Sequence, residues 1–163
     1  EKQKVAARCV GDLVGKLGER VMPELMPIFM NTLSTGDAHV REGVCKGLAE
    51  LIEATSKQLL TDYLADLIPA IRRAIIDDVE SVRNSASTVI VLLHRKELSR
   101  ATTDVVKWVL EQLSVGEVEE HGDLFLNGLE QLLSKQQREV LPIVKDNLTS
   151  IEDGEWTTCQ VKG

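Results

Sequence analysis

The sequence predicts an all-α fold, a right-handed α-solenoid of about three to four stacked helix pairs. Three observations predict it. Apolar residues recur at the spacing of a helix face through almost the whole chain of 163 residues, and no stretch keeps the two-residue alternation of a half-buried strand for long. Segments of similar pattern also recur roughly 40 residues apart, a spacing typical of helical repeats. One helix pair cannot bury its apolar face alone, so neighbouring pairs must share one core.

Eight helices follow from the spacing of the apolar residues. The two clearest stripes lie in residues 58–76 and 38–54. They consist of Leu60, Leu64, Leu67, Ile71 and Ile75 in the first segment, and of Val40, Val44, Leu48 and Leu51 in the second. We expect a helix over residues 3–18, then the pairs 21–33 with 38–54, 58–76 with 79–95 and 102–113 with 117–134, and a last helix over 138–149.

The expected solenoid occupies residues 1–149, and residues 150–163 are expected to form an irregular or disordered tail because they join no apolar stripe. The first residue is Glu1 rather than Met, and the array begins and ends with half of a helix pair. We therefore expect a piece of a longer chain, whose adjoining repeats cover the apolar ends.

Two ladders of equivalent residues define the repeat. The stripe of residues 38–54 recurs 42 residues later as Val82, Ala86, Ile90 and Leu93, and the pair Val40-Arg41 recurs as Val82-Arg83. Residues 46–52, which read KGLAELI, are also similar to residues 127–133, which read NGLEQLL. The other ladder lies in the first helices of the pairs and has intervals of 42, 38 and 35 residues. A proline inside a helix bends it, and such a bend at a fixed position is a feature of HEAT-type repeats. Tetratricopeptide repeats keep a stricter period near 34 residues, so the intervals favour HEAT-type pairs. This second ladder consists of Pro27, Pro69, Lys107 and Pro142.

Composition excludes several classes of protein. The net charge of −7 argues against a sequence-specific nucleic-acid binder, which needs basic residues to neutralise phosphates. No apolar run approaches the roughly 20 residues of a membrane-spanning helix. The three cysteines form no CxxC motif and leave one unpaired, which favours a reduced, intracellular compartment.

The titratable residues show no catalytic pattern. His39, His94 and His121 are far apart and have no metal-ligand partner at helical spacing. Cys9 and Cys45 lie beside the apolar stripes of second helices, where we expect them to be small buried apolar residues. We therefore expect no catalytic residue, no cofactor and no metal site, and a protein that is not an enzyme.

Two glycines within a predicted helix indicate close packing. Gly43 and Gly47 are four residues apart in the segment 38–54. A glycine there costs about 1 kcal/mol relative to alanine. We expect close approach of a neighbouring helix at Gly47 to compensate for this cost.

The candidate partner-binding residues include a repeated arginine. Arg41 and Arg83 occupy one position in successive second helices and would form a basic ladder along the inner helices. They can pair with nearby acids, such as Asp37 and Asp78, or line a binding surface, and one residue per repeat can do both.

The other candidates lie further along the chain. Arg95, Lys96 and Arg100 form a basic patch between two predicted helices, which we expect to be an exposed turn. Trp108 lies in the third first-type helix, where it either fills the core or contributes to a binding surface, because tryptophan is enriched at binding hot spots.

Three segments resemble a known family. They read GDLVGKLGERVMPE over residues 11–24, REGVCKGLAEL over 41–51, followed by ATS at 54–56, and PAIRRA over 69–74 together with VESVRNSA over 79–86. These segments are similar to the large HEAT-repeat activator of the initiation-factor-2-alpha kinase, the general control non-derepressible family, first member. The resemblance covers roughly residues 4–149, and HEAT periodicity alone would not produce it.

This resemblance implies a cytoplasmic, ribosome-associated scaffold without a catalytic centre. Such a protein links translating ribosomes to the kinase that responds to amino-acid starvation and stalled ribosomes. The implied partners are the ribosome, the kinase or other translation factors, and the adjoining HEAT repeats of the same chain. The kinase-gripping segment of the family lies further toward the C-terminus, so the resemblance transfers no site residue to this chain.

The alternative is a HEAT-repeat adaptor of another kind, either a transport receptor or a phosphatase scaffold. Both bind extended peptides along their inner helices. An acidic inner face would favour a transport receptor, whereas the recurrent inner residues here are Arg41 and Arg83.

Overall fold

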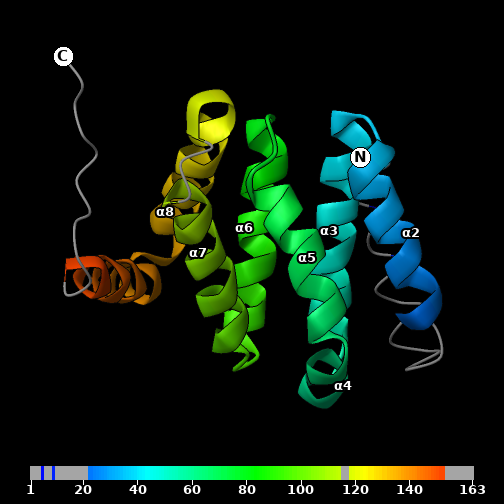
Figure 1. Cartoon of the computed structure of the whole chain (residues 1–163). Helices are drawn as coiled ribbons and strands as arrows, with labels where there is room; N and C mark the ends of the chain where they lie inside the picture. Colours follow the sequence, from blue (N-terminus) through cyan, green and yellow to red (C-terminus); the bar gives the residue numbers. More distant parts are fainter. Residues whose placement is uncertain (1–4, 6–8, 10–21, 115–117, 153–163) are drawn as a thin grey trace.

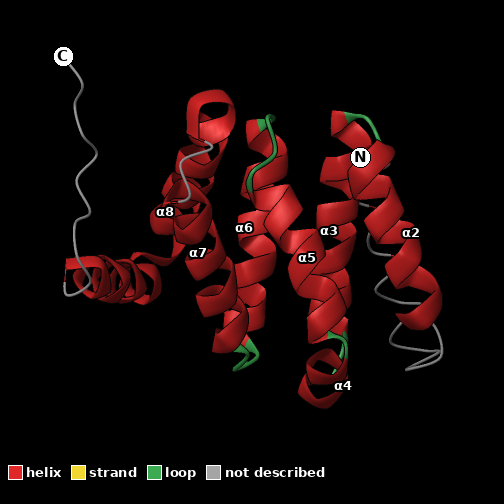
Figure 2. Cartoon of the chain, in the orientation of Figure 1, coloured by secondary structure: helices red, strands yellow, loops and turns green. Residues whose placement is uncertain are grey.

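The computed structural model describes residues 5, 9, 22–114 and 118–152. The described residues form seven α-helices between Met22 and Glu152, and they contain no strand (Figure 2). The predicted all-α solenoid is confirmed. The helices are α2 (Met22–Thr35), α3 (Ala38–Ala54), α4 (Lys57–Asp62), α5 (Leu64–Ile75), α6 (Glu80–Arg95), α7 (Ser99–Ser114) and α8 (Val118–Glu152).

The helices are arranged in two layers. One layer contains α2, α5 and α7, and the other contains α3, α6 and the first part of α8 (Figure 1). Within the pairs, α2 packs on α3, α5 on α6 and α7 on α8. Successive pairs also touch within each layer, since α3 contacts α6 and α5 contacts both α2 and α7. The pairing predicted from the repeat is therefore the pairing that the structure shows.

A single apolar cluster runs between the layers and across all the pairs. The predicted stripes of residues 58–76 and 82–93 are buried along their whole length. In the stripe of residues 38–54, Leu48 and Leu51 are buried and Val44 is partly buried. Val40 is 45% exposed, because it lies in the first turn of α3 beside Gly36. The largest fully buried side chains are those of Leu48, Leu51, Ile52, Leu60, Leu67, Ile71, Ile75, Ile90, Leu93, Leu132 and Val82.

The predicted helix 58–76 is in fact two helices. Ser56 caps α4 by accepting a hydrogen bond from the N–H of Leu59 at 3.4 Å. Tyr63 then leaves helical geometry with φ −97° and ψ 4°, and α5 restarts at Leu64. The apolar pattern continues through the break because Leu60 and Leu64 are both buried on its two sides. Periodicity alone could not show this break.

The predicted helices 117–134 and 138–149 are joined in one element, α8. Gln136 interrupts it with φ −135° and ψ 48°, which places a kink where the sequence predicted a turn. Beyond the kink, the second part leaves the stack at a large angle (Figure 1). Its side chains Leu141 and Leu148 are 51% and 56% exposed. The kink therefore separates a packed half of α8 from a half with an open apolar side.

The turn between α6 and α7 begins α7 three residues earlier than predicted, at Ser99. Glu97 has φ 61°, a left-handed conformation that is uncommon for a residue with a Cβ. Its N–H donates to the carbonyl oxygen of His94 at 2.9 Å, and the N–H of Leu98 donates to the carbonyl oxygen of Leu93 at 2.9 Å. This is the Schellman arrangement that ends many helices, with glutamate where glycine is usual.

The predicted close approach at Gly47 is wrong. A Cβ placed on Gly47 would have no neighbour within 4 Å. The close approach occurs at Gly128, which holds the same place in the similar segment 127–133, where a Cβ would lie 2.7 Å from the carbonyl oxygen of Ile75. Gly128 brings α8 close to the end of α5, whereas a Cβ on Gly47 would touch no neighbouring helix. The same glycine position is therefore packed differently in the two segments.

Two predicted segments lie largely outside the residues that the structure describes. The predicted helix 3–18 lies outside the described residues, apart from Val5 and Cys9, which are helical. Of the predicted tail 150–163, residues 150–152 belong to α8, and residues 153–163 lie outside the described part.

Candidate functional site

Arg41 is held by the turn between α5 and α6. Its Nε donates to Asp77 Oδ2 at 2.6 Å, and its Nη2 donates to Asp77 Oδ1 at 2.8 Å and to Asp78 Oδ1 at 2.9 Å. Its Nη1 donates to the carbonyl of Gly36 at 3.0 Å. The Arg41 side chain is 19% exposed and that of Asp77 is 8% exposed. Arg41 thus pairs with Asp78, as the sequence allowed, and with Asp77, which the sequence analysis did not single out.

Arg83 contacts the same turn from α6. Its Nη1 donates to the carbonyls of Asp77 and Asp78 at 2.7 and 2.9 Å. Asp37, the other acid considered for Arg41, instead caps α3 by accepting from the N–H of Val40 at 2.9 Å. The repeated arginines therefore converge on one turn, which Arg41 reaches from the preceding pair and Arg83 from its own pair.

The geometry around Asp77 determines its acidity. Burial raises the pKa of its carboxyl group, but the hydrogen bonds from Arg41 and from the N–H of Val79 lower it more, so the pKa lies below its ordinary value. The pKa of Arg41 is raised, mainly by its hydrogen bond to Asp77. Both shifts favour the charged pair at neutral pH.

In the basic patch of Arg95, Lys96 and Arg100, only the Lys96 ammonium is shown to bind backbone carbonyls of the fold. Lys96 donates through Nζ to the carbonyls of Glu53 and Thr55, both at 3.0 Å, and so satisfies acceptors at the end of α3. Arg95 is exposed. It lines a depression of about 320 Å³ together with Lys96, Glu53 and Leu92. Arg95 is thus the member of this pair that reaches solvent.

Trp108 packs at the boundary between α5, α7 and α8. Its ring meets that of Phe125 edge-on, with centroids 5.7 Å apart. The guanidinium carbon of Arg72 lies 5.4 Å from the centroid of the Trp108 ring. Arg72 also donates through Nη2 to the carbonyl of Asp104 at 3.2 Å. Trp108 is partly buried, so it contributes to packing and keeps some exposed surface.

Arg100 lies on the first turn of α7 and reaches into solvent. Its Nε is 3.5 Å from Asp104 Oδ2, and its side chain is 83% exposed. Such a loose, exposed pair contributes little to stability. Arg100 and Arg95 are therefore the two predicted binding residues whose charge is most accessible.

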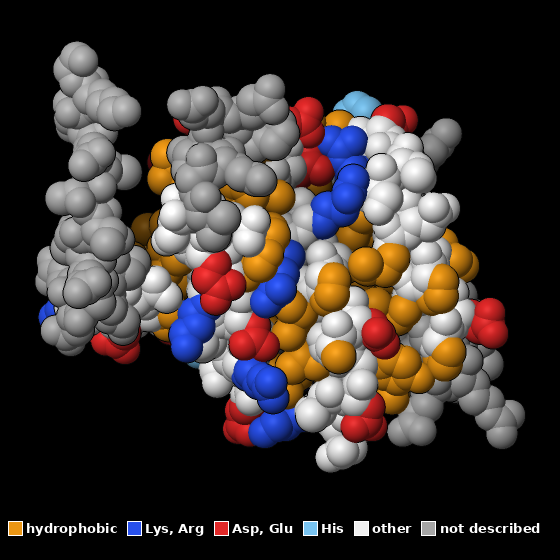
Figure 3. Space-filling model, viewed as in Figure 1, with side chains coloured by type: hydrophobic (Ala, Val, Ile, Leu, Met, Phe, Trp, Pro, Cys, Tyr) orange, Lys and Arg blue, Asp and Glu red, His pale blue; other side chains and the backbone are white. Residues whose placement is uncertain are grey.

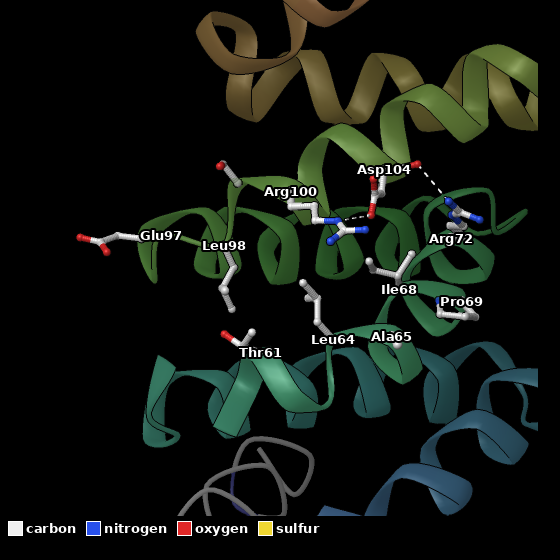
Figure 4. A pocket seen from close by; sticks show the side chains of 11 residues that line it. Thr61, Leu64, Ala65, Ile68, Pro69, Arg72, Glu97, Leu98, Arg100 and Asp104 are labelled. Carbon is white, nitrogen blue, oxygen red and sulfur yellow. Dashed lines mark hydrogen bonds and ion pairs between the residues drawn. The ribbon is translucent and has the colours of Figure 1, made fainter. Parts of the chain in front are cut away.

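A groove of about 530 Å³ lies between α4–α5 and the start of α7 (Figure 4). One end carries the charged side chains of Arg72, Arg100 and Asp104. The space-filling view of this face shows apolar side chains over α2 and α5, and alternating basic and acidic side chains toward α7 (Figure 3). The apolar lining of the groove consists of Leu64, Ile68 and Pro69 on one side and Leu98 on the other.

Sequence reasoning missed Arg72 and Asp77 as members of these arrangements. Arg72 lies beside the buried Ile71, so its neighbours in sequence indicate only a charged residue at the edge of a stripe. Its contacts come from α7, 32 residues away at Asp104. No local pattern could reveal them.

The cysteines and the potential metal ligands are the remaining candidates for chemistry. Burial raises the pKa of the Cys45 thiol to about 12, so it stays protonated at neutral pH, as expected of a small buried residue. Cys9 is exposed, so its predicted burial is wrong. In the described part of the chain, no group of three or more potential ligands could hold a metal ion. No helix there is long and apolar enough to cross a membrane.

Comparison with known proteins relates the chain to one kind of protein. It is 37% identical over 150 residues, 92% of its length, to the mouse protein named stalled ribosome sensor GCN1. The chain is a homologue of a segment of GCN1. The human GCN1 is also 37% identical over 150 residues, and GCN1 of Dictyostelium discoideum, named eIF-2-alpha kinase activator, is 31% identical over 150 residues. The resemblance drawn from the three sequence segments is confirmed.

The match covers a small part of each relative. The chain spans about 6% of the length of the mouse, human and Dictyostelium GCN1 proteins. The yeast GCN1 is 29% identical over 143 residues. No protein-family model and no solved structure matches the chain.

Proposed function

We propose that the chain is a non-catalytic scaffold segment of a large, ribosome-associated activator of the eIF-2-alpha kinase. The observation that carries the proposal is the similarity to GCN1 over 92% of the chain. Relatives at this level bear the names stalled ribosome sensor and eIF-2-alpha kinase activator. The ribosome, the kinase or other translation factors would be reached through the parent protein, in the cytoplasm.

The fold supports a scaffold role by its construction. Each helix pair contacts mainly the next pair, so the segment behaves as an extended, slightly elastic spacer. Several of its charged side chains join pairs, as at Arg41 with Asp77 and Lys57 with Glu97. HEAT-type repeats of the parent protein would continue the stack, and the exposed Leu141 and Leu148 supply apolar surface for them.

A direct contact with the ribosome would need accessible positive charge, because ribosomal RNA presents phosphates. Arg41 and Arg83 are unsuited to this, since their guanidinium groups already bind the α5–α6 turn. Arg95 and Arg100 are exposed and lie on either side of the α6–α7 turn. We therefore assign any charge-driven ribosome contact of this segment to Arg95 and Arg100.

Cosedimentation of the purified chain with ribosomes at several salt concentrations tests the proposal. We expect binding at low salt that weakens as salt rises, and that the double variant Arg95→Gln/Arg100→Gln reduces. A matched control is Arg138→Gln/Lys145→Gln, which removes the same charge from exposed positions of α8. Equal loss in both variants would overturn the assignment to the α6–α7 turn. Absence of binding at low salt would overturn a direct ribosome contact by this segment and leave only a spacer role.

A further inference from the structure

The groove between α5 and α7 contains an arginine that lacks a carboxylate partner among the described residues. Arg72 donates to the carbonyl of Asp104, but its Nε is buried and has no hydrogen-bond acceptor in the described part of the chain. The Arg72 side chain as a whole is half-buried, so it is partly shielded from water and partly accessible from the groove. Arg41, at a comparable junction between pairs, has its charge matched by two carboxylates. Arg83 likewise donates to carbonyls and has a buried Nε with no acceptor in the described part of the chain. Arg72 differs from both Arg41 and Arg83 because it lines the groove, where a carboxylate of a partner can reach it.

The position of Arg72 is fixed before any partner arrives. Its guanidinium is stacked on Trp108 and anchored by the backbone of α7. An ordered guanidinium loses less conformational entropy when it binds a carboxylate, and arginine and tryptophan are the residues most enriched at binding hot spots. Arg100, at the same end of the groove, adds a second positive charge whose 3.5 Å pairing with Asp104 is loose.

The rest of the groove is suited to an apolar side chain. Leu64, Ile68 and Pro69 line one wall, and Leu98 lines the other (Figure 4). A volume of about 530 Å³ is large enough for a few side chains of a peptide. Two arginines and one aspartate leave a net positive charge at that end, and Glu97, at the other end, pairs with Lys57 (Figure 4). A positive end beside an aliphatic wall suits an aliphatic residue near an acidic one.

We propose that the α5–α7 groove binds a short segment of a partner protein, with an aspartate or glutamate of that segment pairing with Arg72 and a neighbouring aliphatic side chain lying against Leu64, Ile68 and Leu98. The proposal deepens the scaffold function and rests on it, because a scaffold acts by holding partners. The occupant is an acidic, aliphatic peptide, and the charge complementarity of Arg72 and Arg100 identifies it.

A peptide selection tests this directly. Random twelve-residue peptides displayed on phage are selected against the immobilised chain, and the most enriched peptide is made with a fluorescein label for fluorescence polarisation. We expect enriched peptides to combine an acidic residue with a nearby leucine, isoleucine or valine. Arg72→Gln should weaken binding by about tenfold or more, because hydrogen bonds between charged groups are among the stronger ones.

The matched control is Arg73→Gln. Arg73 is exposed, lies next to Arg72 on the same helix and does not line the groove, so its loss removes the same charge from the chain. We expect it to change the dissociation constant by less than about twofold, in keeping with a screened surface charge. Equal losses in the two variants, enriched peptides without acidic residues, or a selection that enriches no peptide would each overturn the proposal.

A second variant covers the case in which Arg72→Gln does not fold. Ala65 is exposed, lines the groove and lies in the first turn of α5, where an acidic residue is favourable. Ala65→Glu should therefore fold and should repel an acidic peptide, weakening its binding at least threefold, an effect of roughly the size of one screened charge pair. Unchanged binding would overturn the proposal. A chain that cosediments with ribosomes but selects no acidic peptide contradicts this groove proposal alone, whereas the reverse result contradicts the ribosome contact alone.

Discussion

Arg41 and Asp77 form a two-point ion pair that joins residues 36 positions apart in the sequence, with Nε–Oδ2 and Nη2–Oδ1 distances of 2.6 and 2.8 Å. The pair connects the start of α3 to the turn that leads into α6. Arg83 donates to two carbonyls of the same turn, at Asp77 and Asp78. This turn is therefore the point at which two repeats are locked together through polar contacts.

Removing either partner of this pair should destabilise the fold. We expect Arg41→Ala and Asp77→Ala each to lower the free energy of unfolding by about 1–3 kcal/mol, because each leaves the other group partly buried and unpaired. The double variant should lose less than the sum, and urea denaturation of the four proteins measures the difference. The same cycle at Lys57 and Glu97, an exposed pair that also joins repeats, should show no measurable coupling. Additive losses at Arg41 and Asp77 would contradict the locking role.

Acid should weaken this junction. The pKa of Asp77 is lowered in the folded protein, since the hydrogen bonds from Arg41 and Val79 outweigh the effect of burial. The pKa of Glu42 is also lowered, mainly by its hydrogen bond to Lys46. A lowered carboxyl pKa gives stability that is complete above the ordinary value near 4 and is lost as pH falls through the folded value.

Urea midpoints at several pH values between roughly 7 and 3 measure this loss. We expect the midpoint of the unaltered chain to fall below about pH 4. Asp77→Asn should start from a lower midpoint and show a flatter decline. An equally steep decline in that variant would show that Asp77 does not carry the acid sensitivity.

The two glycines of the repeated motif should respond oppositely to alanine. Gly47→Ala should raise the free energy of unfolding by about 0.5–1 kcal/mol, because a Cβ there has no neighbour within 4 Å and alanine favours a helix. Gly128→Ala should lower it by about 1–3 kcal/mol, because its Cβ would lie 2.7 Å from the carbonyl oxygen of Ile75 and force α8 away from α5. Thermal melts of both variants check the opposite signs, and two changes of the same sign would contradict the packing described here.

The left-handed residue at the end of α6 offers a stabilising substitution. Glycine adopts the φ of 61° found at Glu97 without steric cost, so Glu97→Gly should raise the melting temperature by roughly 2–4 °C over Glu97→Ala. The alanine variant is the matched control, because it also removes the carboxylate that pairs with Lys57 but keeps the Cβ. Equal melting temperatures would indicate that the turn adopts another conformation in solution.

The sequence revealed most of the fold because the solenoid is built from local helices with a repeating apolar pattern. Val82, Ala86, Ile90 and Leu93, predicted to share one face, are all buried. The break at Tyr63 escaped prediction because its neighbours on both sides keep the apolar spacing. Local signals thus identify faces and pairs, but not small departures from helical geometry.

The sites were less predictable, because their contacts come from residues about 30 to 40 positions away. Arg41 was recognised as a repeated residue, yet its main partner Asp77 lies in the turn of the next pair. Arg72 was not singled out at all, since its packing against Trp108 depends on how α5 and α7 meet. Repeats predict which positions are equivalent, whereas the spacing between successive pairs decides what each position touches.

The most direct test of the proposed scaffold function replaces the matching 143-residue segment of yeast GCN1, which is 29% identical, with the corresponding part of this chain. Phosphorylation of eIF-2-alpha is then measured in yeast cells starved of amino acids. If the chain is a scaffold segment of this activator, the chimera should raise phosphorylation as the unaltered yeast protein does, and an unrelated helical spacer of equal length should not. A chimera that is expressed at normal levels but fails to activate the kinase, or a spacer that works equally well, would contradict the account.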